Sequence, residues 1–584
     1  MSGFRQLGHS VDVCVVGGGM AGLCAAIAAA RHGAKVALMH DRPVLGGNAS
    51  SECRVHICGA DRHGRIPNMR ETGILEELRL ENLYRNPNRN FSVWDTVLYE
   101  KARAEPDITL LLNCSCLDAA MDGDAIAWVR GWQLTTQTHH TVSAKIYADC
   151  SGDAVLAPLS GAEFRMGREA RGEYGESIAP QHADEKTMGM TCLFQTRRYA
   201  SPQSFRPPTW ARTFDSCDAL PYGARGHRWW EMGYWWVELG GEGHGIHDTE
   251  RLRDELLAIA YGVWDHIKNR CPAREEAADW ALEWVQFLPA KRESRRYIGE
   301  HVLTQNDIEA EGRFHDVVAY GGWPMDDHHP AGFDAAKLGA PATVFHPAPS
   351  PYGIPYRCLY SRNVANLMFA GRDASCTHAA MSSARVMGTG CSMGQAVGTA
   401  AAVAVRKGIR ACEVGRHIAE LQQTLLRDDA YLPWVTQEFS TLTAGSRLEA
   451  SQGDPEPVRD GVNRPVGDDA HSWTCRPGDS LCCLFPAKSH VGSVHLVLDS
   501  ALDRQVALSY HQRDEQLTSV PDVTPRRFRI EGRLGQRWDG IAEVQHNRQR
   551  LVVIPVDKTL EGIRFVLEET WGSDSSRVYA FYVS

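Results

Sequence analysis

Three glycines near the start of the chain have the spacing of a nucleotide-binding turn. Gly17, Gly19 and Gly22 follow a valine-rich run and precede an alanine-rich segment. Gly17 permits a tight turn, Gly19 lets a pyrophosphate approach the bare backbone, and Gly22 allows a helix to pack closely on a strand. The N–H groups at the start of that helix favour phosphates. We therefore expect a dinucleotide at this turn, in contact with Met20 and Ala21.

A histidine and an arginine follow another apolar run, NLMFAG at 366–371. Gly371 ends this run, Arg372 comes next, and His378 lies seven residues after Gly371. Because doubly wound folds bind ligands at the carboxyl ends of their strands, both side chains are candidates for the site. An unperturbed histidine titrates near ~6.5, so His378 is a candidate general base; a satisfied core histidine is the alternative.

Two further stretches collect charged side chains. AKRESRRYIGEHVLTQND places Arg292, Arg295 and Arg296 within five residues, and AYGGWPMDDHHPAG places His328 and His329 after two aspartates. Arginines could hold a cofactor phosphate or a substrate carboxylate, or could form ordinary surface ion pairs. We take Arg295 and His328 as further candidate catalytic residues.

A glycine-rich segment, GTGCSMGQAVG, is expected to begin a helix near residue 388. The N-terminus of a helix stabilises negative charge, and Gly390, Gly394 and Gln395 would lie at this one. Small side chains such as Ala396 would let the helix lie against a flat ring. A plain buried helix explains the alanines, whereas a bound group explains the paired glycines.

The elements around the first glycines have the order that the turn requires. VDVCVV at 11–16 predicts a buried parallel strand, residues 20–32 predict a helix, and AKVALMH at 34–40 predicts a second strand. An acid usually holds the ribose at the end of the second strand. His40 stands there instead, so the ribose contact is open between His40 and Asp41.

Three motifs together resemble a known family. RPVLGGNASSE carries a Gly-Gly pair after the second strand, KIYADCSGDAVLAPLSGAEF lies at 145–164, and a long segment at 363–405 contains NLMFAGRDASCTH and MGTGCSMGQAVGTAA. In these motifs the chain resembles the FAD-dependent oxidoreductase family, which is related in fold to the fumarate-reductase-like two-dinucleotide-domain flavoproteins. The resemblance covers about 10–160 and 285–410.

The resemblance implies that FAD is the cofactor. Covalent attachment through Cys53 or His56 is left open. The residues expected to contact FAD are Gly17, Gly19, Met20, Ala21, Gly22, His40, Asp41, Arg42, Gly46, Gly47, Asn48, Ser50, Ser51, Asp149, Gly152, Gly371, Arg372, Gly390, Gly394, Gln395 and Ala396. The expected catalytic residues are His378, Arg372, His328 and Arg295.

The composition bounds the class of protein. A formal net charge of −10 argues against a nucleic-acid or anionic-membrane surface. No apolar run reaches the ~18 residues of a membrane span, and MSGFRQLGHSVD lacks the apolar core of a signal peptide. The 17 cysteines include no C-x-x-C pair, so we expect free thiols and no metal site. A cytoplasmic protein is expected.

The expected fold class is α/β with two additions. An FAD-binding Rossmann-like domain comprises residues 1–164 and 346–440, an α+β substrate domain is inserted at 165–345, and a linker leads to an all-β jelly-roll-like sandwich at 445–584. WWEMGYWWVEL in the insertion alternates as a half-buried strand. Most tryptophans there are expected in the core, with sugar stacking as the alternative. The sandwich resembles galactose-binding modules.

The leading functional hypothesis is hydride transfer from a small polar substrate to FAD, with a carbohydrate or polyol alcohol favoured. Same-fold alternatives are an amine or carboxylic-acid dehydrogenase and a double-bond reductase. A flavin electron-transfer subunit and a carbohydrate-binding protein with a vestigial flavin fold are further alternatives. Since no second dinucleotide motif appears, electrons should pass to oxygen, a quinone or a redox protein. A homo-oligomer is compatible with the sequence.

Overall fold

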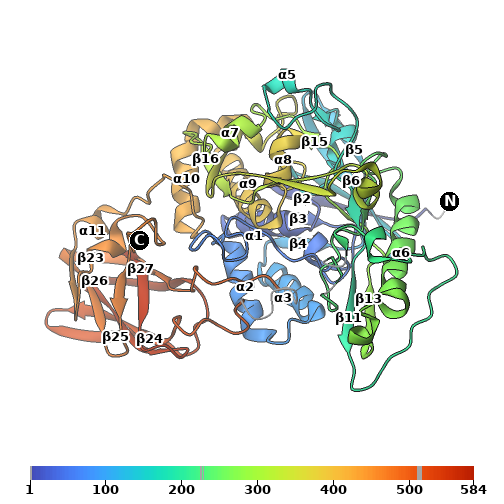
Figure 1. Ribbon diagram of the computed structural model, residues 1–584. Helices are drawn as coiled ribbons and strands as arrows, with labels where there is room; N and C mark the ends of the chain where they lie inside the picture. The colour runs from blue at the N-terminus through green and yellow to red at the C-terminus, as the bar shows by residue number, and fades with distance from the viewer. Residues whose placement is uncertain (1–2, 224–225, 228, 509–515) are drawn as a thin grey trace.

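A computed structural model describes residues 3–223, 226–227, 229–508 and 516–584 (Figure 1). Its centre is a five-stranded sheet in the order β20-β8-β2-β3-β4, in which every neighbouring pair is parallel. The strands are short and buried, as the valine-rich runs predict. They are β2 (Val13–Val16), β3 (Val36–Met39), β4 (Ile108–Leu111), β8 (Ile146–Asp149) and β20 (Leu367–Phe369).

Two helices that contact the central sheet pack closely against each other because both are rich in small residues. They are α1 (Met20–Arg31) and α9 (Met387–Lys407). A Cβ placed on Gly394 would lie 2.1 Å from the Ala21 oxygen, and one on Gly398 would lie 2.1 Å from the Ala25 oxygen. Glycine at these two positions therefore allows the backbones to touch.

A second sheet and several short elements flank this layer. The sheet, in the order β1-β7-β6-β5, is antiparallel except for the β1–β7 pair. Its strands are β1 (Arg5–Ser10), β5 (Cys114–Asp122), β6 (Ala125–Gln133) and β7 (Thr138–Ser143). The accompanying helices are η1 (Gly47–Ala49), α2 (Ile74–Arg85), α3 (Phe91–Ala104), α4 (Leu156–Ser160), α8 (His378–Ala384), η8 (Ala411–His417) and α10 (Ile418–Arg427).

The middle of the chain forms small antiparallel pairings and one long helix, α6 (Thr249–Asp265). Its strands are β9 (Phe164–Arg165), β10 (Met190–Thr191), β11 (Phe194–Arg198), β12 (Glu238–Leu239), β13 (Trp280–Val285), β14 (Ala290–Lys291), β15 (Arg296–Tyr297), β16 (Val317–Gly321), β17 (Met325–His328), β18 (Thr343–His346) and β19 (Tyr352–Pro355). Its short helices are α5 (Arg171–Tyr174), η2 (Cys217–Ala219), η4 (His266–Arg270), η5 (Arg274–Ala277), α7 (Gln305–Glu309), η6 (Gly332–Leu338) and η7 (Tyr356–Cys358).

The tryptophan-rich stretch differs from the strand that its alternation predicts. Only Glu238–Leu239 pairs as a strand; the described residues before it form turns. Trp236 and Trp264 are buried in a core of their own, whereas Trp210 and Trp229 are exposed. An irregular segment can also bury every second side chain, so alternation of aromatic and polar residues does not by itself establish a strand.

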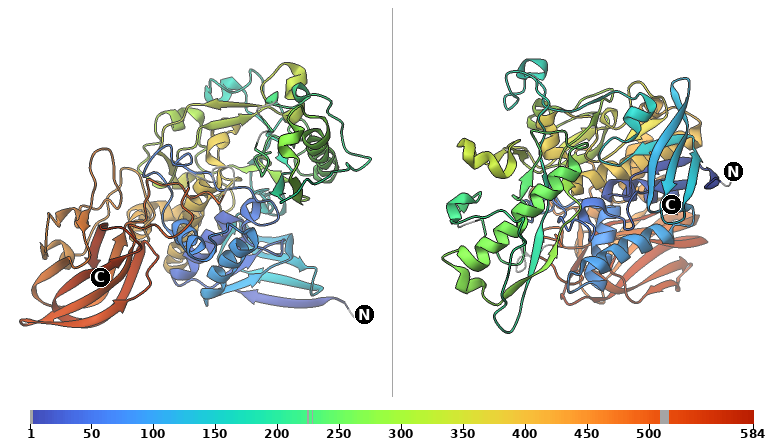
Figure 2. Two further views of the ribbon diagram at one scale, coloured as in Figure 1. Left: turned by 60° about the horizontal axis from the view of Figure 1, so that its bottom comes forward. Right: turned by 90° about the vertical axis from the view of Figure 1, so that its right-hand side faces the viewer.

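The C-terminal region is all-β, as predicted, and forms one continuous antiparallel sheet around an apolar core (Figure 2). Two of its strands, β23 and β26, are 19 and 20 residues long, with irregular register between Leu484 and Ser489. Its elements are α11 (Thr441–Ala444), β21 (Arg447–Ala450), η9 (Glu456–Arg459), β22 (Trp473–Cys475), β23 (Ser480–Leu498), β24 (Pro525–Leu534), β25 (Arg537–Val544), β26 (Leu551–Thr570) and β27 (Ser576–Val583).

Three buried arginines join this sheet to the rest of the chain. Arg70 is bonded to Glu76 and donates to the carbonyl oxygen of Ser500 at 2.9 Å. From the other side, Arg464 donates to the Asn68 oxygen at 2.9 Å, and Arg550 pairs with a buried aspartate. The segment before the sheet was expected to act as a linker, but these contacts make an extensive interface.

Among the described residues, every helix is too short or too polar to span a lipid bilayer.

Candidate functional site

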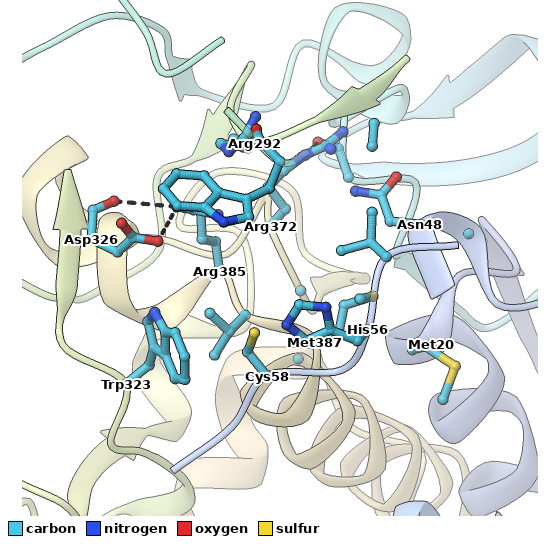
Figure 3. A pocket seen from close by; sticks show the side chains of 18 of the residues that line it. Met20, Asn48, His56, Cys58, Arg292, Trp323, Asp326, Arg372, Arg385 and Met387 are labelled. Atoms are coloured by element: carbon cyan, nitrogen blue, oxygen red, sulfur yellow. Dashed lines mark hydrogen bonds and ion pairs between the residues drawn. The ribbon is translucent and has the colours of Figure 1, made fainter. Parts of the chain in front are cut away.

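A cavity of about 750 Å³ opens where three strands of the central sheet end. The residues that follow β2, β8 and β20 line it, and so does the start of α9. Figure 3 shows Met20 and Asn48 on one side, Trp323 and Asp326 on the opposite side, and His56 and Met387 between them. The carboxyl ends of the strands therefore form one end of a cavity whose other end comes from the middle of the chain.

Glycines from four separate segments form a smooth concave surface, which we call the glycine cradle. Its members are Gly19, Gly47, Gly371 and Gly390, and all of them line the cavity. A Cβ on Gly19 would have only the Gly47 Cα within 4 Å, and one on Gly390 would approach nothing nearer than 3.6 Å. A side chain at Gly19 or Gly390 would thus occupy the cavity rather than collide with the protein.

Two helices begin at the cradle without a capping side chain. The N-cap of α1 is Gly19, which has no side chain, and the N-cap of α9 is Val386, whose side chain is apolar. Neither residue can accept a hydrogen bond from the helix through a side chain. The first N–H groups of a helix lack partners within it and carry partial positive charge. The start of α1 is consequently suited to oxygen-rich, negatively charged groups, whereas at the start of α9 the N–H of Gly388 already donates to the Cys58 oxygen at 2.8 Å.

The other two glycines of the first motif have a scaffold role. A Cβ on Gly22 would lie 1.9 Å from the Gly17 oxygen, and one on Gly17 would lie 2.5 Å from the backbone of Cys150. Gly17 also has a φ of 100°, which favours glycine. They bring turn, helix and strand together, as the motif predicts, but they do not line the cavity.

His40 was expected to contact the ribose, and its position is different. It is buried beneath the turn, where the N–H of Gly18 donates to its Nδ1 at 3.0 Å and its Nε2 donates to the Val44 oxygen at 3.0 Å. Burial lowers the pKa of His40, which suits the neutral ring that this pattern requires. His40 therefore supports the turn from below and has no nitrogen left for a ribose.

Several other expected contacts also lie outside the cavity lining. Asp41 is exposed, Arg42 pairs with Glu52, the N–H of Ser51 donates to Asp95 and Ser50 is buried behind the loop. These side chains come two to five residues too early or too late in the loop. In contrast, Gly46, Gly47 and Asn48 line the cavity, together with Met20 and Ala21.

The turn after β8 and the turn after β20 are held together by one side chain. Arg372 lines the cavity, donates to the Gly152 oxygen at 2.8 Å and pairs with Asp153 at 2.8 Å. Gly152 also lines the cavity, whereas Asp149 accepts bonds from Ser151 and Leu156 inside the turn. Arg372 is thus a positioning residue for the cradle, with its charge largely matched.

The expected contacts farther along α9 are packing residues. The helix begins at Met387, so Gly394, Gln395 and Ala396 lie in its second and third turns and are buried. Gln395 accepts a hydrogen bond from the N–H of Ile74 at 3.0 Å. The paired glycines, which suggested a bound group, instead divide between the cradle, at Gly390, and the contact with α1, at Gly394.

Opposite the cradle is a group of polar side chains that we call the polar wall: Arg292, Trp323, Asp326, His328 and Arg385. All five line the cavity. His328 lies between two carboxylates, with Nδ1 2.6 Å from Glu238 and Nε2 3.2 Å from Asp326. Arg385 donates to Asp326 at 3.2 Å, and Arg292 lies 3.3 Å from Glu238.

The charges of the polar wall are set by burial and by mutual pairing. Burial alone would raise the pKa of Asp326, but His328, Arg385 and Arg292 outweigh it and lower that pKa to about 2. Burial lowers the pKa of Arg292, against the opposing effect of Glu238. Asp326 is therefore ionised at neutral pH and is a weak base.

Two donors of the polar wall lack a protein partner. Trp323 Nε1 and Arg385 Nε are buried and have no hydrogen-bond partner among the described residues. Buried donors are usually satisfied, so unpaired ones beside a cavity indicate where a ligand oxygen could bind. The polar wall is consequently suited to a molecule rich in hydrogen-bond acceptors.

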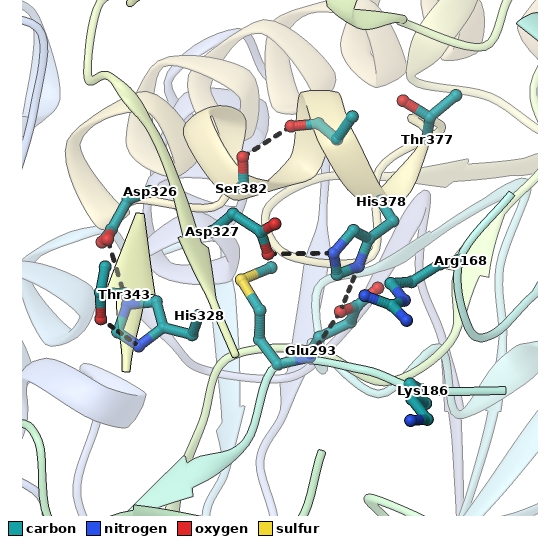
Figure 4. A network of polar contacts seen from close by, with 12 residues as sticks. Arg168, Lys186, Glu293, Asp326, Asp327, His328, Thr343, Thr377, His378 and Ser382 are labelled. Atoms are coloured by element: carbon teal, nitrogen blue, oxygen red, sulfur yellow. Dashed lines mark hydrogen bonds and ion pairs between the residues drawn. The ribbon is translucent and has the colours of Figure 1, made fainter. Parts of the chain in front are cut away.

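His378 was expected to be a general base that faces the substrate, but it lies in a separate buried charge cluster (Figure 4). Its Nδ1 lies 2.8 Å from Glu293 and its Nε2 lies 3.3 Å from Asp327. Burial alone would lower the pKa of His378, but these two carboxylates raise it to about 10. A histidine that already holds its proton between two acids cannot accept one from a substrate, and His378 does not line the cavity.

The arginine-rich stretch splits among three environments. Arg292 belongs to the polar wall, Arg296 is fully buried and pairs with Glu169 at 2.7 Å, and Arg295 stacks over the ring of Phe164. Arg295 therefore lies away from the cavity, contrary to the expectation that it is catalytic. Residues that are close in sequence separate here because the chain crosses from a strand into the buried charge cluster.

Three cavity-lining residues were not foreseen as catalytic: His56, Cys58 and His63. Their ligand atoms lie within 4.8 Å of one another, with Cys58 Sγ 3.6 Å from His63 Nε2. A signal exists in the sequence, since CRVHICGADRHGR begins five residues after Asn48 of the Gly-Gly-Asn turn and lacks helical or strand periodicity. A loop this polar, beginning at a ligand-binding turn, is a candidate for chemistry.

Comparisons with known proteins bear on this geometry. The model of the FAD dependent oxidoreductase family matches residues 12–425. No curated protein matches the chain. Among solved structures, a geranylgeranyl bacteriochlorophyll reductase-like protein from Thermoplasma acidophilum is 12% identical, with a TM-score of 0.32; the match covers 72% of this chain and 86% of that one.

Two other solved structures match shorter parts of the chain. A family 32 carbohydrate-binding module from Streptococcus pneumoniae EndoD is 14% identical, with a TM-score of 0.20, and covers 25% of this chain and 99% of that chain. L-Proline dehydrogenase from P. horikoshii is 19% identical, with a TM-score of 0.17, and covers 25% of this chain and 24% of that chain.

Proposed function

The chain belongs to the FAD dependent oxidoreductase family, and from this premise we propose that FAD occupies the glycine cradle while a small polar substrate binds against the polar wall. The bare backbone of Gly19 and Gly47 and the uncapped start of α1 would accept the pyrophosphate. The start of α9 at Met387 would face the ring system. When bound, FAD supplies a ring that can take up a hydride from a substrate C–H bond.

We propose a polyhydroxylated alcohol, such as a sugar or a polyol, as the substrate. The polar wall offers unpaired buried donors at Trp323 and Arg385, and it offers the ionised carboxylate of Asp326 as an acceptor. Hydroxyl groups can both donate and accept, so one polyol can satisfy this mixed set. The rings of Trp235 and Phe345 also line the cavity and could pack on the apolar face of a sugar.

A second candidate is a substrate that carries a carboxylate, such as an amino or hydroxy acid. The observation that favours it is the excess of cations around the cavity. Arg62 lines the cavity, and among the described residues it donates to the backbone oxygens of Gly322 and Ala348 and pairs with no acid. An arginine in this state suits a carboxylate ligand.

We propose that His56, and not His378, accepts the hydroxyl proton. Its ring lies between the cradle and the polar wall, beside Met387 (Figure 3). A proton acceptor must reach the substrate hydroxyl, and His56 is the labelled histidine between the two sides of the cavity in the close-up of Figure 3. The two ring nitrogens of His328 already face carboxylates, Nδ1 that of Glu238 and Nε2 that of Asp326.

The observation that carries this proposal is that one cavity joins the glycine cradle to unpaired polar donors. Mixing the FAD-loaded protein anaerobically with sugars, polyols, amino acids and hydroxy acids tests it, because flavin absorbance bleaches on reduction. We expect bleaching by a polyol or a sugar. Bleaching by amino or hydroxy acids alone would select the second candidate, and no bleaching by any of them would oppose a dehydrogenase.

Variants of the histidines locate the proton acceptor. We expect His56→Asn to slow flavin reduction by about 10²–10⁴-fold while FAD stays bound. His63→Asn, a neighbour in the same loop, is the matched control and should slow it far less. A normal reduction rate in His56→Asn would remove this residue from the role.

Further parts of the proposal concern partners and organisation. We propose that electrons leave to an external acceptor, which can be oxygen, a quinone or a redox protein, and steady-state turnover with each acceptor would identify it. We also propose that residues 165–345 act as the substrate domain between the two parts of the FAD domain. Carbohydrate binding by the C-terminal sheet is proposed as well, and titration of that sheet with sugars tests it.

A further inference from the structure

Four side chains outside the cavity lining bring their metal-binding atoms together. They are Cys217 in η2, His227, His266 at the start of η4, and Cys271 directly after η4. One ligand atom from each lies within 4.8 Å of all the others, and three of the four residues are buried. Two thiols and two imidazoles are the ligand set of many structural zinc sites.

The distances between these atoms match the edges of a tetrahedron. For bond lengths of about 2.3 Å to sulfur and about 2.0–2.1 Å to nitrogen, tetrahedral angles imply a sulfur–sulfur edge of about 3.8 Å and sulfur–nitrogen edges of about 3.5 Å. The two Sγ atoms are 3.8 Å apart. Cys217 Sγ lies 3.6 Å from His227 Nε2 and 3.4 Å from His266 Nε2, and His227 Nε2 lies 3.4 Å from Cys271 Sγ.

The outer nitrogen of each imidazole is already engaged. Nδ1 of His266 donates to the Phe214 oxygen at 2.8 Å, and Nδ1 of His227 donates to the Gly223 oxygen at 3.1 Å. These bonds place the lone pair of each Nε2 toward the two sulfurs. Metal-binding histidines characteristically make this outer hydrogen bond, which fixes both the tautomer and the orientation of the ring.

We propose that Cys217, His227, His266 and Cys271 bind one Zn²⁺ ion in a tetrahedral, structural site. Four protein ligands leave no position for a substrate, and none of the four residues lines the cavity, so the role of the site is to hold the fold together. A disulfide between the two cysteines is the alternative, but their sulfurs are 3.8 Å apart, well above the ~2.05 Å of a disulfide. A disulfide would also not account for the two imidazoles whose Nε2 atoms lie beside the sulfurs.

The site would fasten a loop that leads to the polar wall. The loop with His227 also contains Gly226, whose oxygen accepts a hydrogen bond from the buried Trp236 at 3.0 Å. Trp235, which precedes Trp236, lines the cavity, and its ring lies 5.9 Å from that of His328. The ion would thus join this loop to the end of α6, because His266 and Cys271 follow that helix.

The metal content of the full-length protein tests the proposal. Protein expressed with added zinc and purified without chelators should contain about one zinc ion per chain by elemental analysis. Cys271→Ser and His266→Ala should reduce this to a small fraction. Two matched controls should retain the zinc: Cys192→Ser removes another buried thiol of the same region, and Cys58→Ala removes the thiol of the cavity group.

Cobalt provides a second measurement that does not depend on stable variants of the four ligands. Co²⁺ in place of Zn²⁺ in the Cys58→Ala protein should give the visible bands of a tetrahedral ion and the charge-transfer absorption of bound thiolates. Zinc-free protein, zinc lost only in Cys58→Ala, an octahedral cobalt spectrum, or a Cys217–Cys271 disulfide in mass spectrometry would each overturn the proposal.

Discussion

The glycine cradle and the polar wall face each other across one cavity, but they are built in opposite ways. The cradle consists of backbone at strand ends and helix starts, so its shape depends on residues that lack a side chain, such as Gly19 and Gly390. The polar wall consists of side chains whose charges depend on partners far away in sequence, such as Glu238 for His328. A backbone site follows from local sequence, whereas a side-chain site follows from tertiary contacts.

The largest expected effect is at the cradle. In Gly19→Val the new side chain would project into the cavity without striking the protein. We therefore expect a folded protein that has lost its bound flavin, with FAD affinity at least roughly 100-fold lower, which corresponds to about 2.8 kcal/mol. Flavin absorbance after gel filtration, together with circular dichroism, measures both properties.

Two control variants separate the cradle from the scaffold. Gly8→Val, on an edge strand where a Cβ meets nothing within 4 Å, should change neither flavin content nor stability. Gly394→Val should destabilise the fold itself by about 1–3 kcal/mol, since its side chain would strike the Ala21 oxygen. If Gly19→Val retained full FAD, Gly19 would be part of the scaffold and the contrast would fail.

The second effect concerns the buried charge cluster behind the polar wall. His378→Asn would leave Glu293 and Asp327 without their shared partner, and breaking such a buried pair costs about 3–5 kcal/mol. We expect a clear fall in unfolding free energy, with flavin still bound and its rate of reduction changed by less than about threefold. A loss of reduction rate of 10²-fold or more would return His378 to a catalytic role.

The same histidine predicts how stability depends on pH. The pKa of His378 is about 10 in the folded protein and near ~6.5 when unfolded, so the folded state holds the proton more tightly. Its contribution is complete below about pH 6.5 and is lost as the pH rises through about 10. Denaturant unfolding between pH 6 and 10 should show this decline in the natural protein and a weaker decline in His378→Asn.

The smallest effect is expected at a single donor of the polar wall. Trp323→Phe keeps an aromatic ring but removes the buried Nε1, which has no partner among the described residues. One hydrogen bond contributes about 0.5–1.5 kcal/mol, so KM for the substrate should rise roughly 2- to 13-fold. The unfolding free energy should stay within about 0.5 kcal/mol of the natural value. An unchanged KM would mean that the substrate does not use this donor.

Much of the fold could be predicted because its signals are local. The buried strands at Val13–Val16 and Val36–Met39 and the helix between them agree with the apolar runs and glycines of the sequence. The all-β tail was foreseen from alternation. The tryptophan-rich stretch was predicted to be a strand, but among the described residues of 229–239 only Glu238–Leu239 pairs with another strand.

The site was predictable only where backbone decides it. Among the glycines that line the cavity, Gly19 was identified from the spacing of its motif and Gly46 and Gly47 from the family resemblance, but His40, Gln395 and His378 were assigned to ligands although protein groups already occupy their polar atoms. No local rule reveals that Glu293 and Asp327 approach His378. For the same reason, the spacing of cysteines did not indicate that Cys217 and Cys271 would meet two histidines.

The buried Arg70 has a consequence for how the molecule comes apart. Arg70 belongs to the segment that follows His63 of the cavity lining. Its guanidinium donates to the carbonyl oxygens of Ser500 and Ala501 in the C-terminal region. A ligand that orders this segment also stabilises its contact with the C-terminal region. Breaking that contact destabilises the cavity lining. Thermodynamic linkage then requires that FAD raise the free energy of tail detachment by as much as detachment weakens FAD binding.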